Sequence, residues 1–340
     1  MSLRKIGAKT LEGTHFAGSA KLQTLQFSVM KNGTDTGRTF GLVIVTPAQG
    51  GAPPPVIIMQ NFCPNHDVIP HPDIPKPAGD YFSCSADGVM ANIFSYFFGR
   101  YITTPPVKDI MARGYALAVM YPSEFVPDNR ESGQVVLGEI FKDQHAATST
   151  GAIAAWAAQF SLVRGYLDAN REFSSHIAYG HSRFGKSALL ATAYDPDIDG
   201  AIAHQSGTGG ASLSRDKPGE TVTDITEGFP HWFSQAYAAY GGAENTLPID
   251  QHHLLALIAP RPVMLGNARR DVWSDPNGAF RAAQGANPVY GLYGSGGLRQ
   301  IKLTDFDPAA DIAFWMRPGT HGVVKEDWPA FLEFLDAHFK

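Results

Sequence analysis

Short apolar runs that alternate with helical segments constrain the fold of this chain more than any other sequence feature. The runs lie at residues 55–62, 115–121, 176–182, 200–206, 262–268 and 312–319. Helical patterns with an apolar stripe cover residues 147–169, 186–195 and 327–340. Strands that alternate with helices favour a parallel or mostly parallel sheet with helices on both faces. The sequence therefore predicts an α/β fold.

The N-terminal part of the sequence has a different pattern. Two strand-like runs, 23–30 and 39–47, flank the segment KNGTDTGR, whose Asn-Gly pair is typical of a hairpin turn. We expect these runs to form an antiparallel edge of the sheet. Residues 63–110 and 284–300 are rich in Pro, Gly and Asp, and we interpret both as long functional loops. Because no repeat and no clear linker divides the chain, residues 1–340 are predicted to form a single domain.

Composition excludes several classes of partner. The chain has 340 residues, 44% hydrophobic and 17% charged, with a formal net charge of -5 and no run of like charge. Such a chain can bury a large core, but it offers no basic surface for nucleic acid or an anionic membrane. It contains no stretch of 18 apolar residues, so we expect no membrane span. Cys63 and Cys84 form one disulfide or remain two thiols, and two cysteines cannot frame a zinc site.

The stretch YGHSRFGK, residues 179–186, lies where an apolar strand meets a helix. A strand-to-helix elbow with flanking glycines exposes a serine hydroxyl at the carboxyl edge of the sheet, where the helix N-terminus faces it. Ser182 is therefore a candidate nucleophile. The alternative is an ordinary turn with a serine N-cap, because the usual spacing is G-x-S-x-G and Gly185 comes one residue late.

A nucleophilic serine needs a base, and the base needs a carboxylate that orients it. His321 lies in a glycine-containing loop after the last strand-like run, which is the place of the base in an α/β-hydrolase. Asp271 follows the run 262–268 and is the candidate acid. Asp275 is the fallback, although an aspartate before proline commonly forms a turn.

Five segments of the chain together resemble one family. They are GHSRFGK, HQSGTGGASLSR, FPHWF, DQHHLLALIAPRP and RRDVWSDPNGAF. From roughly residue 140 to the C-terminus the sequence resembles the glucuronoyl esterases, carbohydrate esterase family 15, whose G-x-S-R-x-G-K motif accounts for the late glycine. The resemblance implies a three-layer α/β-hydrolase fold. It also implies a serine esterase that cleaves esters of (4-O-methyl)glucuronic acid, as in lignin–glucuronoxylan linkages, through an acyl-enzyme and without a metal or organic cofactor.

The resemblance implies roles for individual residues. Ser182 matches the nucleophile, His321 the base, and Arg183 the arginine that stabilises the oxyanion with its backbone N–H and guanidinium. Lys186 matches the lysine that binds hydroxyls of the uronic acid ring. Trp273 matches the tryptophan that borders the sugar pocket.

The sequence departs from the family pattern at one position. Many members have a catalytic glutamate just before S-G-x-G-G, where this chain has Gln205, and an amide cannot supply the charge that stabilises imidazolium. Some bacterial members use an aspartate after the penultimate strand, and Asp271 matches it. Gln205 is therefore counted with the substrate-binding candidates. Glu220 and Glu227 join them, because they lie where the family places sugar-contacting residues, without a fixed register.

Two other functions fit the same sequence. One is a carbohydrate acetyl esterase of the same fold, and the other is a non-catalytic carbohydrate-binding relative, which Gln205 motivates. The family implies a secreted or periplasmic location, although the opening residues MSLRKIGAKTLEG lack the apolar centre of a signal peptide. We expect a monomer that acts on a small-molecule or polysaccharide uronic-acid ester.

Overall fold

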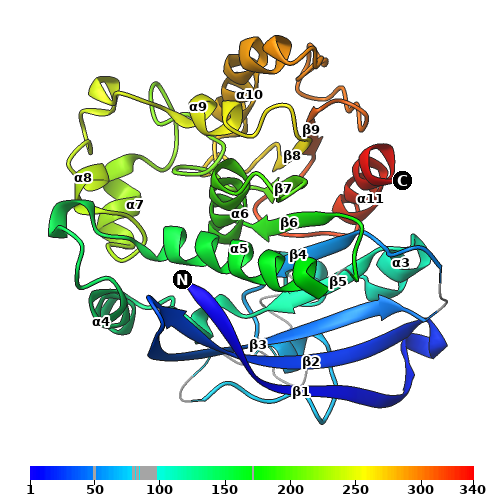
Figure 1. Cartoon of the computed structure of the whole chain (residues 1–340). Coiled ribbons are helices and arrows are strands. Elements are labelled where there is room, and N and C mark those ends of the chain that lie inside the picture. The colour runs from blue at the N-terminus through cyan, green and yellow to red at the C-terminus, as the bar shows by residue number, and fades with distance from the viewer. Residues whose placement is uncertain (49–50, 79–80, 82–83, 85–97, 171) are drawn as a thin grey trace.

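The computed structural model describes residues 1–48, 51–78, 81, 84, 98–170 and 172–340 (Figure 1). Within these residues one nine-stranded sheet has the order β1-β2-β3-β5-β4-β6-β7-β8-β9. Its N-terminal edge is antiparallel and consists of β1 (Ser2–His15), β2 (Ala20–Lys31) and β3 (Thr34–Pro47). The β2–β3 hairpin turns at Asn32 and Gly33, both with positive φ, as the Asn-Gly pair predicts. The antiparallel edge is confirmed.

The other strands of the sheet run parallel to one another, and β3 joins them through an antiparallel pairing with β5. All six predicted apolar runs form strands. They are β4 (Val56–Gln60), β5 (Ala116–Met120), β6 (His176–His181), β7 (Gly200–His204), β8 (Val263–Ala268) and β9 (Ile312–Arg317). The mostly parallel sheet of the predicted α/β fold is therefore present.

Helices cover both faces of the sheet (Figure 1). Alternate side chains of β4 explain why, since Val56 and Ile58 pack in the core under one helical layer while Ile57 and Met59 pack under the other. The first layer contains α5 (Ala152–Asn170), α6 (Arg183–Tyr194), α9 (Gln251–Ala256) and α10 (Pro276–Leu292). The second contains α3 (Val107–Ala112) and α11 (Asp327–Phe339). The predicted three-layer architecture is confirmed.

Shorter elements occupy the connections between these layers. The α-helices among them are α1 (Asn65–Val68), α4 (Arg130–Ile140), α7 (Val222–Gly228) and α8 (Gln235–Ala238). The 3-10 helices are η1 (Phe16–Gly18), η2 (Arg100–Ile102), η3 (Pro122–Glu124), η4 (Ala146–Thr148) and η5 (Glu244–Thr246). In Figure 1, α4, α7 and α8 lie together at one end of the molecule, beyond the N-terminal end of α5.

The loop predicted at 284–300 is partly wrong, because α10 continues to Leu292 with Pro288 inside it. The glycine that suggested a loop has a packing role. A Cβ on Gly285 would lie 2.9 Å from the Cβ of His252 on α9, so the absent side chain lets the two helices approach. The predicted loop 63–110 contains α1, η2 and α3, while its residues 85–97 lie outside the described part of the chain.

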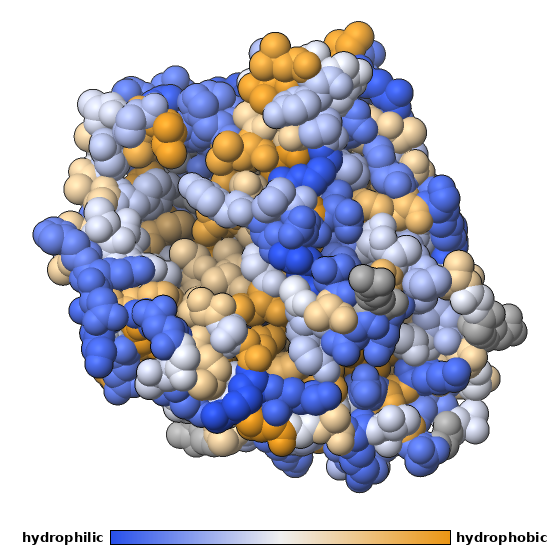
Figure 2. All heavy atoms as spheres, in the orientation of Figure 1, coloured by the Kyte–Doolittle hydropathy of each residue, from blue (hydrophilic) through white to orange (hydrophobic). Residues whose placement is uncertain are grey.

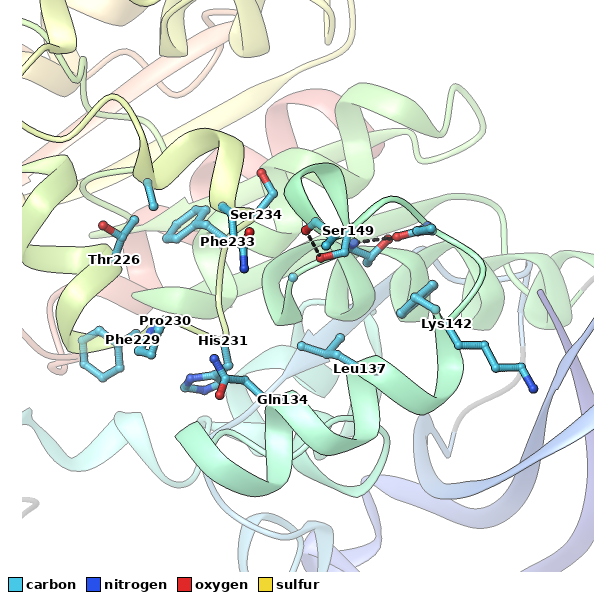
Figure 3. Close-up of a pocket in the computed structure, with 18 residues that line it drawn as sticks. Gln134, Leu137, Lys142, Ser149, Thr226, Phe229, Pro230, His231, Phe233 and Ser234 are labelled. Carbon is cyan, nitrogen blue, oxygen red and sulfur yellow. Dashed lines mark hydrogen bonds between the residues drawn. The ribbon is translucent and has the colours of Figure 1, made fainter.

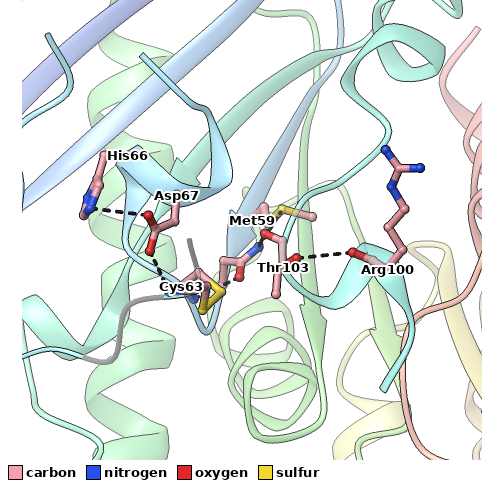
Figure 4. The surroundings of a disulfide bond; sticks show 8 residues. Met59, Cys63, His66, Asp67, Arg100 and Thr103 are labelled. Atoms are coloured by element: carbon pink, nitrogen blue, oxygen red, sulfur yellow. Dashed lines mark hydrogen bonds and ion pairs between the residues drawn. A yellow bond between two sulfur atoms is a disulfide. The ribbon is translucent and has the colours of Figure 1, made fainter. Parts of the chain in front are cut away.

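A disulfide joins Cys63, in the loop after β4, to Cys84 (Figure 4). Asp67 of α1 accepts a hydrogen bond from the backbone N–H of Cys84 at 2.7 Å, which ties α1 to the same bond. The structure thereby decides between the two states left open for the cysteines. Among the described residues, no helix has the length and apolar composition needed to cross a bilayer.

Candidate active site

Ser182 lies in a strained turn between β6 and α6. Its backbone has φ 56° and ψ -123°, a region that non-glycine residues rarely occupy. Its N–H donates to the carbonyl of His204 at the end of β7, which fixes the turn against the neighbouring strand. Within the described chain its side chain makes no capping hydrogen bond to α6. The N-cap alternative is therefore wrong, and the geometry is that of a nucleophile elbow.

The two glycines of the motif explain how the elbow packs. A Cβ on Gly180 would lie 2.0 Å from the carbonyl oxygen of Phe184, so only glycine fits there. A Cβ on Gly185 would lie 3.0 Å from the Cβ of Ser206, and the missing side chain lets α6 start close to the segment after β7. Phe184 takes the place of the usual second glycine and is 1% exposed in the core.

The loops after β8 and β9 bring Asp271 and His321 together. His321 Nδ1 lies 2.7 Å from Asp271 Oδ2. Because a carboxylate only accepts hydrogen bonds, Nδ1 carries the proton and Nε2 is left as the basic nitrogen. Burial alone would raise the pKa of Asp271, but the hydrogen bond and charge of His321, together with the donors of Ser274, hold it below its ordinary value. The carboxylate of Asp271 is thus ionised beside the imidazole.

Gln205 supports the loop that carries His321. Its amide Nε2 donates to the carbonyl of Thr320 at 3.3 Å, and its Oε1 accepts from the N–H of Gly322 at 2.7 Å. These two partners flank His321, and Gln205 is only 1% exposed. Its side-chain amide therefore contacts the backbone of the histidine loop, while its interpretation as a substrate-binding residue stays a prediction. Sequence reasoning missed this contact because the amide was compared only with a catalytic carboxylate.

A buried ion pair between Arg317 and Asp327 also supports the loop that carries His321. Arg317, the last residue of β9, binds both oxygens of Asp327 at 3.0 Å. Its remaining N–H groups donate to the carbonyls of Pro318, Thr320 and Gly322. The guanidinium therefore replaces regular secondary structure as the partner of the loop backbone. No pattern in the sequence distinguishes this arginine from a surface residue.

Two further histidines, His181 and His204, lie close to His321. The His181 ring is 4.6 Å from that of His321, and its Nδ1 is 3.1 Å from Nδ1 of His204. Burial, together with repulsion from the neighbouring imidazoles, lowers the pKa of His181 well below its ordinary value. The ring next to the elbow is consequently neutral at physiological pH, and it adds no positive charge beside the nucleophile.

Arg183 begins α6, directly after Ser182. Its side chain forms an ion pair with Asp128, and its guanidinium carbon lies 4.7 Å from the ring centre of Trp232. The rings of Phe62 and Phe229 lie at 5.4 and 5.6 Å. Guanidinium stacking on aromatic faces combined with a carboxylate contact restricts the rotamers of the arginine. The guanidinium of the residue after Ser182 is therefore held in place by these contacts rather than free in solvent.

Lys186 points into the protein from the first turns of α6. Its Nζ donates to the carbonyls of Ser206 at 2.7 Å and Thr208 at 2.6 Å, which uses two of the three donors of an ammonium. The residue is 4% exposed, and burial lowers its pKa to about 8, an effect that the nearby charge of Glu220 opposes. Lys186 thus holds the loop after β7 and keeps a donor for another group.

The exposed Trp273 is hydrogen-bonded to the buried Glu220. Trp273 Nε1 donates to Glu220 Oε1 at 3.1 Å, and the backbone N–H of Glu220 donates to the carbonyl of Trp273 at 3.4 Å. Gly219 permits this approach, because its φ is +84° and a Cβ would lie 2.3 Å from the carbonyl oxygen of Val272. The indole remains 57% exposed, so a ring face is open to a ligand.

Comparison with known proteins places this geometry in a family. A family model described as "Glucuronyl esterase, fungi" matches residues 102–294. A carbohydrate esterase from an unknown prokaryotic organism is 36% identical over 309 residues, covering 87% of this chain and 71% of that protein. A 4-O-methyl-glucuronoyl methylesterase of Wolfiporia cocos is 30% identical over 201 residues, 56% of this chain and 48% of its own length.

Solved structures agree with the sequence matches. A promiscuous esterase of carbohydrate esterase family 15 from a marine bacterial metagenome has a TM-score of 0.86 and 32% identity, covering 99% of this chain and 86% of that one. A glucuronoyl esterase from Solibacter usitatus has a TM-score of 0.84 and 30% identity, with 100% and 87% covered. The chain belongs to the glucuronoyl esterases of carbohydrate esterase family 15. It is a carboxylic ester hydrolase.

Two other candidates of this glucuronoyl esterase lie apart from the pair at His321. Asp275 caps α10, since its side chain accepts from the N–H of Gly278 at 2.9 Å, which is the turn role expected before proline. Glu227 lies exposed near the end of α7, where its carbonyl accepts from Arg130. The contacts of Glu227 give no support to its interpretation as a sugar-contacting residue.

In the described part of the glucuronoyl esterase, no group of three or more His, Cys, Asp or Glu side chains is arranged to hold a metal ion.

The residues near the site that sequence reasoning missed are ones that support other groups. Asp128, Arg317 and Asp327 act on other side chains or on loop backbone, and all three come from segments without a motif. Only the apolar positions around them could have indicated that they are buried.

Proposed function

We propose that this enzyme hydrolyses esters of (4-O-methyl)glucuronic acid, as found in lignin–glucuronoxylan linkages, with Ser182 as nucleophile, His321 as base and Asp271 as acid. The observation that carries the proposal is the 2.7 Å bond between His321 Nδ1 and Asp271 Oδ2, on loops next to a strained serine elbow. The relatives named for glucuronoyl ester hydrolysis supply the substrate class.

The reaction proceeds in two steps. Ser182 Oγ attacks the ester carbonyl carbon while Nε2 of His321 takes the hydroxyl proton. The tetrahedral intermediate then releases the alcohol, which receives that proton, and leaves a glucuronoyl ester on Ser182. A water molecule, deprotonated by the same imidazole, attacks this acyl-enzyme; the bond to Ser182 Oγ breaks, the imidazolium returns the proton to Oγ, and the uronic acid is freed. Asp271 stabilises the imidazolium in both steps, because its lowered pKa keeps it ionised.

Arg183 stabilises the oxyanion in this proposal. Its backbone N–H belongs to the first turn of α6, and helix N-termini favour negative charge. The guanidinium adds a full positive charge that does not titrate at any working pH. Because oxyanion charge exists only in the transition state, this contribution acts on kcat more than on KM.

Lys186, Trp273 and Glu220 form the sugar side of the site. The exposed indole of Trp273 offers a flat apolar face, and Glu220 fixes its orientation through the 3.1 Å hydrogen bond. Lys186 supplies a donor at the loop after β7. A charged donor together with an apolar ring face suits a uronic acid ring with several hydroxyls.

The carbohydrate acetyl esterase remains the second candidate. A related esterase is described as promiscuous, which supports activity on simpler esters as well. Relative rates on benzyl glucuronate and an aryl acetate separate the two functions. The non-catalytic alternative rested on the amide at Gln205. In this proposal Asp271 provides the carboxylate and Gln205 contacts the histidine loop, so that argument no longer favours it.

The direct test is Ser182→Ala, which should lower turnover of a glucuronate ester by roughly 10⁴-fold or more while the fold persists. Ser161→Ala on the partly exposed face of α5 is the matched control and should retain wild-type activity. Retention of more than about a tenth of the rate in Ser182→Ala contradicts a serine mechanism.

We also propose that the protein works in an oxidising compartment, secreted or periplasmic. The Cys63–Cys84 disulfide supports this location, since disulfides persist outside the reducing cytosol. Fractionation of cells that express the natural protein tests it, and a reduced protein confined to the cytosol would contradict it.

A further inference from the structure

Asp128 collects three donors at the side of the nucleophile elbow. Arg183 Nη1 binds its Oδ2, while His231 Nε2 and Trp232 Nε1 bind its Oδ1 at 3.1 and 2.8 Å. The carboxylate precedes α4, far from the elbow in sequence, and its side chain is 15% exposed. Neither the sequence motifs nor the proposed reaction assigns it a role.

The charge of this carboxylate is stable. Burial on its own would raise the pKa of Asp128, but the hydrogen bond of His231, the charge of Arg183 and the hydrogen bond of Trp232 outweigh it and lower the pKa to about 2. The carboxylate therefore stays ionised over the whole range in which the enzyme can work. Its interaction with the guanidinium does not vary with pH there.

The two neutral donors are held by a rigid scaffold. The first backbone N–H groups of α5, from Ala152 and Ile153, donate to the carbonyls of His231 and Trp232. Gly151 allows this contact, since a Cβ there would lie 2.3 Å from the carbonyl oxygen of Trp232. The helix N-terminus thus fixes the backbone of the FPHWF segment, and the segment in turn fixes Asp128.

Hollows lie on either side of Asp128 and His231. His231 lines a cavity of 420 Å³ between α4 and the segment that joins α7 to α8, and Figure 3 shows its ring beside Gln134 of α4. In the orientation of Figure 2 this end of the molecule is hollowed, with apolar residues at the bottom and polar residues on the rim. Asp128 lines a separate hollow of 790 Å³ that also contains Tyr121 and Asn129. Asp128 and His231, which are bound to each other, therefore each line a different hollow.

One donor of Arg183 is left unused by this arrangement. Its Nε is buried and has no hydrogen-bond partner among the described residues. An unpaired buried N–H is costly, so the surrounding residues impose this placement of the guanidinium rather than the guanidinium choosing it. Asp128 binds Nη1 and thereby fixes one end of the planar group.

We propose that Asp128, held by His231 and Trp232, is a positioning residue that orients the Arg183 guanidinium toward the oxyanion. The inference rests on the proposed function, in which Arg183 contacts the reacting carbonyl oxygen. Asp128 touches neither substrate nor nucleophile. It acts through the arginine, by fixing the plane of the guanidinium before the substrate arrives, so that no reorientation is needed when charge develops.

Asp128→Asn tests the inference with the least disturbance, because the amide keeps an acceptor for the neutral donors but loses the charge. We expect kcat on methyl glucuronate to fall by roughly 10- to 100-fold, less than the loss of a whole oxyanion donor, while KM changes by less than about threefold. Trp232→Phe is the second variant. It keeps an aromatic ring over Arg183 but removes the N–H donor to Asp128, and it should lower kcat by a smaller factor.

A double-mutant cycle separates positioning from a structural role. In an Arg183→Ala background, Asp128→Asn should change kcat by less than about twofold, because no guanidinium remains to be oriented. If the full loss persists in that background, Asp128 acts through something other than Arg183 and the proposal is overturned. Wild-type kcat in Asp128→Asn overturns it as well.

Asp195→Asn is the matched control. Asp195 also forms a buried ion pair with an arginine, Arg164, at 3.1 Å, but at the far end of α6. It should lower the melting temperature without changing kcat. If Ser182→Ala is inactive while Asp128→Asn is fully active, the positioning inference fails and the proposed function stands. If Ser182→Ala retains activity, the proposed function fails first.

Discussion

Two buried carboxylates hold two basic side chains of the site, His321 and Arg183, and they do so in different ways. Asp271 binds His321 from a loop that follows a strand of the parallel sheet. Ser182 likewise follows a strand of that sheet. Asp128 binds Arg183 from an irregular loop before α4, together with two donors from a third segment. The histidine side (Asp271 and His321) thus comes from loops that directly follow sheet strands. The arginine side (Asp128 and Arg183) depends instead on contacts between irregular segments far apart in the sequence.

The largest expected effect concerns the histidine side. Asp271→Asn should lower kcat by roughly 10²- to 10⁴-fold, because the amide permits the wrong imidazole tautomer and no longer stabilises imidazolium. Steady-state kinetics on a glucuronate ester measure it. Asp275→Asn, which alters only the cap of α10, is the control and should have a far smaller effect on kcat. A crippled Asp275→Asn beside a nearly silent Asp271→Asn would show that the wrong aspartate is assigned.

The next prediction sharpens the histidine side further. Gln205→Glu should lower kcat by roughly 10-fold at neutral pH, since a carboxylate still accepts from Gly322 but faces the carbonyl of Thr320 without a proton to donate. The loss should shrink as pH falls and the new carboxyl gains a proton. A ratio of variant to wild-type kcat that does not change with pH would contradict this positioning role.

The difference between the two sides also explains what could be predicted from the sequence. Runs such as 55–62 and 262–268 indicate buried strands by composition alone, and Asp271 follows from its place after one of them. Asp128 could not be found in this way, because nothing local marks a loop aspartate that meets an arginine far along the chain. β1 was not assigned, since its mostly exposed edge position leaves a mixed sequence without a clear apolar pattern.

Lys186 joins the comparison because it lies on the same helix as Arg183 but titrates. Burial lowers its pKa to about 8, so the ammonium is charged below that pH and neutral above it. We therefore expect kcat/KM on a glucuronate ester to be nearly full at neutral pH and to fall roughly tenfold by about pH 9 as the charge is lost. An aryl acetate lacks the ring hydroxyls and should show no such limb. An equal alkaline loss on both substrates would remove Lys186 from sugar binding.

The smallest effect on activity is expected from the disulfide. Cys63 directly follows Phe62, whose ring covers Arg183, so the bond borders the arginine side. Replacement of both cysteines by serine should reduce the free energy of unfolding by about 3 kcal/mol, from the closed loop of roughly 20 residues, and change kcat by less than about twofold. Denaturant unfolding and kinetics on the same sample measure both. A kcat loss as large as that of Asp128→Asn would mean that Phe62, rather than Asp128, dominates the arginine side.

The central claim is that Ser182 forms the covalent intermediate, and peptide mass spectrometry after treatment with a serine-directed phosphonate tests it most directly. The account predicts one phosphonate per chain, attached to the peptide that contains Ser182, with loss of esterase activity in proportion to labelling. Ser182→Ala should take up no label. Modification of a different residue, or full activity in a protein labelled at Ser182, would contradict the claim.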